Sequence, residues 1–204
     1  MTETKKGLRI TAGILLLITA CISLAATCSS ILSLIKADQT SALLQLWHSG
    51  ATALLGVIAA ILILARKFIG AGIMKCLILV ISLVRIGITL AGALNGISFS
   101  GEIFAGVLTT YALQLAGSVF AVLLIIGLFL HNRKSKGFLI AGAILSLSTT
   151  LISQVQTMIQ YVKMSGEAKT MAVSLGINGT IAVLTFVGWI LLAVYFGAQK
   201  KAAA

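Results

Sequence analysis

Six long apolar runs are the feature that most restricts how this chain can fold. They cover Ile10–Ile35, Ala42–Ala65, Phe68–Leu94, Ile103–Leu130, Phe138–Val162 and Ile177–Ala198. Each run reaches the roughly 20 residues that a helix needs to cross about 30 Å of hydrocarbon. None alternates apolar and polar residues as the strands of a membrane barrel do. We therefore predict an all-α integral membrane protein with six transmembrane helices in a single domain, residues 1–204.

The composition supports this class of protein. Hydrophobic residues make up 59% of the chain and charged residues 9%, whereas soluble domains average about 45–50% and 25%. The segment Ile18–Cys21 resembles a bacterial lipoprotein box, which would mark a cleavable signal. Apolar sequence continues past it to Ile35, and the apolar part of a signal is only about 7–15 residues long. A membrane span is therefore the better interpretation.

A basic pair follows every second run at a constant spacing of 67 residues. The pairs are Arg66-Lys67, Arg133-Lys134 and Lys200-Lys201. The loop between the two runs of each hairpin holds a single acid, which is Asp38, Glu102 or Glu167. This pattern predicts three repeated helix hairpins, near residues 8–67, 68–134 and 135–201, in a pseudo-threefold arrangement.

Basic residues are distributed unequally between the two ends of the predicted spans. One end carries eleven: Lys5, Lys6, Arg9, Arg66, Lys67, Lys75, Arg133, Lys134, Lys136, Lys200 and Lys201. The other end carries three: Lys36, Lys163 and Lys169. Basic residues favour the cytoplasmic side, so we expect a multi-pass plasma-membrane protein with both termini cytoplasmic and a bacterial source. The net charge of +11 then reflects orientation and attraction to anionic lipid, and we expect no nucleic-acid partner.

The first, third and fifth runs each carry a stripe of polar residues at helical spacing. The stripes comprise Thr19, Ser23, Thr27, Ser30 and Ser33; Ser82, Arg85 and Thr89; and Ser146, Thr149, Ser153, Gln156 and Gln160. The second, fourth and sixth runs contain long stretches that are apolar nearly all round. Polar faces turn away from lipid, so we expect the odd runs at the centre and the even runs around them.

Two interpretations of the stripes stay open at this point. The hydroxyl and amide groups either bond one helix to another or line a cavity that a solute can enter. The stripes lie mostly in the second half of each odd run, and the first halves hold small residues that permit close packing. The second interpretation therefore predicts a bundle that is tight at its cytoplasmic end and hollow toward the outside.

Arg85 is the charge that we predict to lie deepest in a span. Placing arginine at mid-membrane costs about 2.5–3.5 kcal/mol on insertion scales, and no acid lies in any run to neutralise it. Its guanidinium either fixes a helix through water and amides, binds an anionic group, or pairs with an acid of a partner. We expect it to face the interior near Gln156. The candidate solute-binding residues are Arg85, Ser82, Thr89, Gln154, Gln156, Gln160, Ser23 and Ser153.

The sequence does not favour an enzyme, a metal site or a cofactor. No run contains a carboxylate, no histidine or cysteine set has the spacing of metal ligands, and no nucleotide-binding loop is present. The leading hypothesis is a protein that binds or passes a small, anionic solute through an outward-facing polar cavity, in combination with a separate energising complex. The alternative is a non-transporting accessory, scaffold or immunity-type subunit that binds another membrane protein.

Overall fold

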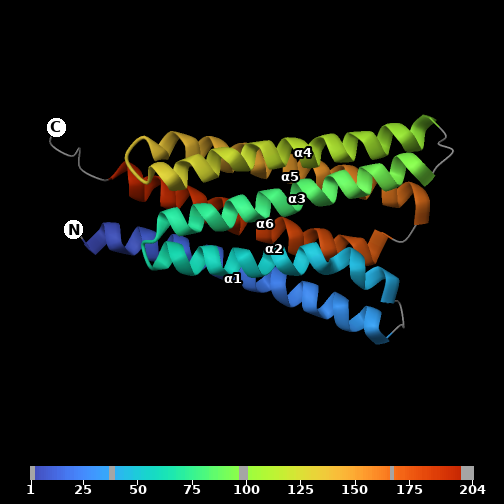
Figure 1. The fold of residues 1–204 in the computed structure, drawn as a ribbon, viewed down its shortest axis with the longest axis horizontal. Coiled ribbons are helices and arrows are strands. Elements are labelled where there is room, and N and C mark those ends of the chain that lie inside the picture. Colours follow the sequence, from blue (N-terminus) through green and yellow to red (C-terminus); the bar gives the residue numbers. More distant parts are fainter. Residues whose placement is uncertain (1–2, 37–39, 97–100, 166–167, 199–204) are drawn as a thin grey trace.

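The computed structural model describes residues 3–36, 40–96, 101–165 and 168–198. They form six helices: α1 (Glu3–Lys36), α2 (Thr40–Leu64), α3 (Phe68–Gly96), α4 (Gly101–Leu130), α5 (Ser135–Ser165) and α6 (Ala168–Gly197). The helices run up and down, and the start of α1 and the end of α6 lie at one end of the bundle with the loops after α2 and α4 (Figure 1). We call this the terminal end and the other the opposite end. All six helices are long and apolar enough to cross a membrane.

The helices form a closed ring in chain order. Each helix packs against its neighbours in the sequence, and α1 packs against α6 to close the circle. Within the described part of the chain, α1, α3 and α5 do not pack against one another. The expectation that the odd helices lie at the centre with the even helices outside is therefore wrong. The threefold repeat stays a prediction.

The ring exposes large apolar side chains on all six helices, including those with polar stripes. Leu54 and Ile61 on α2 are exposed, and so are Ile18 on α1 and Val80 on α3. Even helices lack a polar stripe near the terminal end because their inner faces pack on the apolar core there. Their outer faces also carry apolar side chains.

The hydrophobic core lies at the terminal end, inside the ring. Its largest fully buried members are Ile63, Leu128, Leu139, Leu192 and Phe196. Aromatic side chains join helices that are not neighbours in the ring: Phe68 on α3 lies 4.8 Å from Phe196 and 6.0 Å from Tyr195, measured between ring centres. This core closes the interior of the ring at the terminal end.

Glycines allow the hairpins to pack closely beside this core. A Cβ atom at Gly13 on α1 would lie 2.6 Å from Leu64 on α2, and one at Gly127 on α4 would lie 2.7 Å from Leu139 on α5. Both distances are far shorter than an ordinary contact between carbon atoms. A side chain at either position would require the facing leucine to move, so glycine allows the ends of these helices to meet, although the helix itself would prefer alanine.

Candidate functional site

Beyond the core, the ring encloses a chamber made of three adjoining lobes. Their volumes are about 370, 480 and 310 Å³, and Thr185 and Trp189 on α6 line all three. The chamber has polar side chains from every helix: Thr19, Ser23, Thr27, His48, Ser49, Thr52, Lys75, Ser82, Arg85, Gln114, Ser118, Ser146, Thr149, Thr150, Ser153, Gln154, Asn178 and Thr185. Each lobe has the size of a small-molecule site, which is about 300–1,000 Å³.

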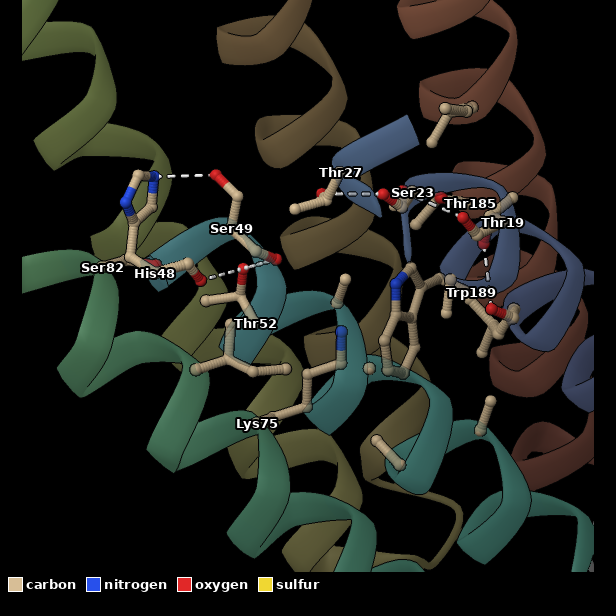
Figure 2. Close-up of a pocket in the computed structure, with 18 of the residues that line it drawn as sticks. Thr19, Ser23, Thr27, His48, Ser49, Thr52, Lys75, Ser82, Thr185 and Trp189 are labelled. Carbon is tan, nitrogen blue, oxygen red and sulfur yellow. Dashed lines mark hydrogen bonds between the residues drawn. The ribbon is translucent and has the colours of Figure 1, made fainter. Parts of the chain in front are cut away.

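Lys75 and Trp189 form the floor of the chamber. The Lys75 ammonium lies 5.2 Å from the centre of the Trp189 ring, within the range of a cation–π interaction. Figure 2 shows the lysine side chain beside the indole, with the hydroxyl groups of α1 and α2 around them. The distribution of basic residues in the sequence predicts that Lys75 lies at the cytoplasmic end of its span. The structure instead places it in the interior, about 10 Å from the start of α3 at a rise of about 1.5 Å per residue.

Arg85 lies on the same helix, ten residues beyond Lys75. It lines the two larger lobes together with Lys75 and Ser82. The rise of a helix separates the Lys75 and Arg85 backbones by about 15 Å along α3. Neither cationic group has a hydrogen bond or an ion pair with another residue in the part of the chain that the structure describes. Two cations therefore face one chamber without a protein anion beside them.

Several other predicted site residues also line the chamber. Ser23 lines the first lobe, and Ser153 and Gln154 line the second. Thr89 is exposed, and its hydroxyl donates to the Arg85 carbonyl at 2.8 Å. Gln156 is half-buried and lines none of the three lobes. The side chain of Gln160 lies outside the described residues, as do Asp38, Glu167 and the pair Lys200-Lys201.

Many chamber hydroxyls donate hydrogen bonds within their own helix. Thr19, Ser23, Thr27, Thr52, Ser118, Thr149 and Thr150 each bond a carbonyl oxygen three or four residues earlier. Such bonds satisfy the hydroxyl hydrogen without joining two helices. The oxygen lone pairs stay available to water or a solute. This arrangement favours a lined cavity over bonding between helices.

Among the described residues, the chamber lining contains lysine, arginine and histidine but no carboxylate. The chain has four acids, of which Glu3 and Glu102 are in the first turns of α1 and α4, whereas Asp38 and Glu167 lie outside the described residues. His48 on α2 is 7% exposed, and its Nε2 lies 2.9 Å from the Ser49 hydroxyl oxygen. Fixed charge in the chamber is therefore positive, which suits a solute of opposite sign.

Three chamber residues are not among the candidates that the sequence predicts: Lys75, His48 and Trp189. A signal for Lys75 was present, because Lys75, Ile78, Ser82 and Arg85 follow steps of three and four along one helix face. Trp189 offered no such signal, since α6 carries apolar residues on all sides there. Its position depends on the ring closing between α1 and α6.

The described residues show no metal-binding arrangement. No group of three histidine, cysteine, aspartate or glutamate side chains in the described ranges could hold a metal ion. The chamber can offer cationic donors, amides, hydroxyl acceptors and one aromatic face. Comparisons with protein-family models, with curated proteins and with solved structures find no match for this chain. The function is therefore inferred from the chamber alone.

Proposed function

We propose that this protein binds a small anionic solute in the chamber, as a multi-pass protein of the plasma membrane whose chamber opens outward. The observation that carries the proposal is the presence of Lys75 and Arg85 in one chamber whose lining, over the residues that the structure describes, has no carboxylate. A charged group inside a bundle is costly unless it is paired or solvated. An anion that enters the chamber supplies the missing partner for both cations.

The two cations have different roles in this proposal. Arg85 lies toward the opposite end, and its planar guanidinium can hold two oxygens of a carboxylate or phosphate at once. Lys75 lies at the floor, where its compact ammonium is held over Trp189. The solute meets Arg85 first and then approaches Lys75. Amides of Gln114 and Gln154 provide further donors beside the second lobe.

The core beneath the floor favours a binding protein over an open pore. Leu192 and Phe196 are fully buried there, and Phe68 crosses the ring to meet α6. A solute at Lys75 would have to displace this packing in order to continue. Passage would therefore require a conformational change, which suits a capture protein that works with a separate energising complex.

The alternative of a non-transporting accessory subunit has less support from the surface. Exposed apolar side chains are spread over all six helices, which suits lipid around the whole ring. A partner protein would favour a contiguous patch on one side.

Trp189 provides a direct test of charge preference inside the chamber. The chain has two tryptophans, so Trp47→Phe leaves Trp189 as the only indole. The measurement is the extent to which iodide, caesium and neutral acrylamide each quench the fluorescence of Trp189 in the detergent-purified protein. We expect quenching by iodide to exceed quenching by caesium at equal ionic strength, because Lys75 and Arg85 concentrate anions beside the ring.

The double variant Lys75→Met, Arg85→Leu tests whether these two cations cause the preference for iodide. Lys134→Gln is the control, because it changes a charge outside the chamber. The iodide preference should disappear in the double variant and persist in the control, with acrylamide quenching unchanged in both. Equal quenching by iodide and caesium in the parent protein would refute the proposal.

A further inference from the structure

A second pocket lies at the terminal end, separate from the chamber. It has a volume of about 330 Å³ and is formed where the α2–α3 turn meets the end of α4. Its lining combines three basic residues with an apolar wall: Leu62, Arg66, Lys67, Phe68, Ile69, Gly70 and His131. No acid is among these residues, so the pocket presents positive charge to whatever enters it.

The backbone around this pocket is held by specific hydrogen bonds. Arg66 has a φ of 62° and ends α2 in a left-handed turn, with its N–H donating to Ile63 O at 3.1 Å. The Lys67 N–H donates to Leu62 O at 2.8 Å. This pair of bonds is a Schellman motif, which directs the Arg66 and Lys67 side chains from a fixed turn.

His131 completes the pocket from the next loop. Its φ of 34° is also left-handed, and its Nδ1 donates to the Phe129 carbonyl at 2.7 Å. The imidazole is stacked on Phe68, with ring centres 6.4 Å apart and planes 21° apart. These contacts fix the ring and leave Nε2 as the nitrogen available to a ligand.

An exposed apolar strip continues from the pocket along α3. Ile69 lines the pocket and is 53% exposed, and Ile73, one turn further on the same face, is 47% exposed. Phe129 on the adjoining helix is 40% exposed. The ligand that matches both parts has an anionic head beside a long apolar tail.

We infer that this pocket binds the headgroup of an anionic phospholipid. The phosphate lies between Arg66 and Lys67, and one acyl chain follows Ile69 and Ile73 along α3. The imidazolium form of His131, which carries a hydrogen on both ring nitrogens, adds Nε2–H as a further donor. Basic residues at a membrane face attract anionic lipid, and here the basic residues form a defined pocket at the end of a helix that could span the bilayer. The inference does not depend on the proposed solute.

The test measures the melting temperature of the detergent-purified protein as phosphatidylglycerol is added. Phosphatidylcholine is the neutral lipid, and inorganic phosphate is the anion without acyl chains. We expect phosphatidylglycerol to raise the melting temperature, because a ligand that binds only the folded state stabilises it. Phosphatidylcholine and phosphate should have little effect at matched concentrations.

Matched variants show whether the pocket is responsible. Lys67→Gln together with His131→Gln should raise the phosphatidylglycerol concentration needed for half of the shift about tenfold. Arg133→Gln together with Lys134→Gln changes exposed residues outside the pocket and should leave that concentration unchanged. Each shift is measured from the variant's own lipid-free melting temperature, which separates binding from basal stability.

Three outcomes would overturn the inference. Equal stabilisation by phosphatidylcholine would show that only the apolar strip matters. Equal stabilisation by inorganic phosphate would show a site for the free anion. An equal loss in the variant that changes Arg133 and Lys134 would show attraction by diffuse surface charge rather than by this pocket.

Discussion

Lys75 on α3 and Trp189 on α6 meet across the interior of the ring, with the lysine ammonium 5.2 Å from the centre of the indole. The two helices are not neighbours in the ring, so this contact spans the space that the other helices enclose. It therefore sets the depth of the chamber. Toward the opposite end of the bundle the lining is polar, and toward the terminal end the core is apolar.

Lys75→Met should leave the protein at least as stable as the parent while weakening its preference for anions. A cation–π contact contributes up to about 2 kcal/mol when desolvated. Burying an ammonium without a carboxylate partner costs several kcal/mol, which is more than that contact contributes. Methionine fills a similar volume. The melting temperature in detergent and the ratio of iodide to caesium quenching of Trp189 are the two measurements. A large drop in melting temperature with an unchanged ratio would assign Lys75 a structural role.

Arg85 allows charge to be separated from geometry in the proposed site. Arg85→Lys keeps the charge but loses the planar pair of donors, so we expect impaired solute binding. Arg85→Leu should abolish it. Because Arg85 is exposed and has no described ion pair, neither change should lower the melting temperature by more than a few degrees.

Ser82 lies one turn before Arg85 and reports on the same site. With Cys21, Cys28 and Cys76 replaced by serine, Ser82→Cys should react faster with an anionic methanethiosulfonate than with a cationic one of similar size. Arg85→Leu should reduce that difference in rate, because only Lys75 remains as a cation in the chamber, and Arg85→Lys should preserve it. A ratio of the two reaction rates that does not change with the charge at position 85 would contradict the placement of Arg85 beside the solute path.

The helices could be predicted from the sequence because their signal is local. Runs such as Phe68–Leu94 and Ile103–Leu130 agree closely with α3 and α4. The order of packing could not be predicted in this way. A stretch that is apolar all round is expected both for a helix surrounded by lipid and for one with lipid on one face and core on the other. Leu128 is fully buried and Val119 is exposed on the same helix, and composition alone does not separate them.

Only part of the site was visible in the sequence for a related reason. Arg85 was identified because no membrane face is near enough for its side chain. Lys75 is close to a helix start, where lysines usually extend to the membrane surface. Its side chain points inward because it contacts Trp189 on α6, and this contact forms only when the helices close into a ring.

Arg66→Gly should stabilise the protein in lipid-free detergent. Arg66 holds the left-handed conformation at the end of α2, with a φ of 62°, and this conformation costs a non-glycine residue roughly 1–2 kcal/mol. Glycine adopts it without that cost and keeps both hydrogen bonds of the turn. Arg66→Ala is the matched control, since it removes the side chain but retains the strain. We expect a higher melting temperature for glycine than for alanine, and the reverse order would show that the turn is not strained.

Arg9 was counted in the sequence as a marker of the cytoplasmic side, but the structure gives it a packing role. It is 5% exposed on α1, and its Nη1 donates to the carbonyl oxygens of Ile63, at 3.2 Å, and Leu64. These carbonyls lie in the last turn of α2, where helix carbonyls lack the usual donor four residues later, and Ile63 O also accepts from the Arg66 N–H at 3.1 Å. A positive charge at a helix C-terminus is also favourable.

Arg9→Gln should therefore lower the melting temperature clearly, because the buried carbonyl oxygens lose a charged donor, which costs about 1.5–3 kcal/mol. Arg9→Lys should have an intermediate effect, since one ammonium can reach a carbonyl but lacks the fork of the guanidinium. Lys6→Gln removes the same charge from an exposed position on the same helix and should leave the melting temperature almost unchanged. If Arg9 served only to orient the chain in the membrane, Arg9→Gln and Lys6→Gln would behave alike in purified protein. A clear difference between them assigns Arg9 to the contact that holds the end of α2 against α1.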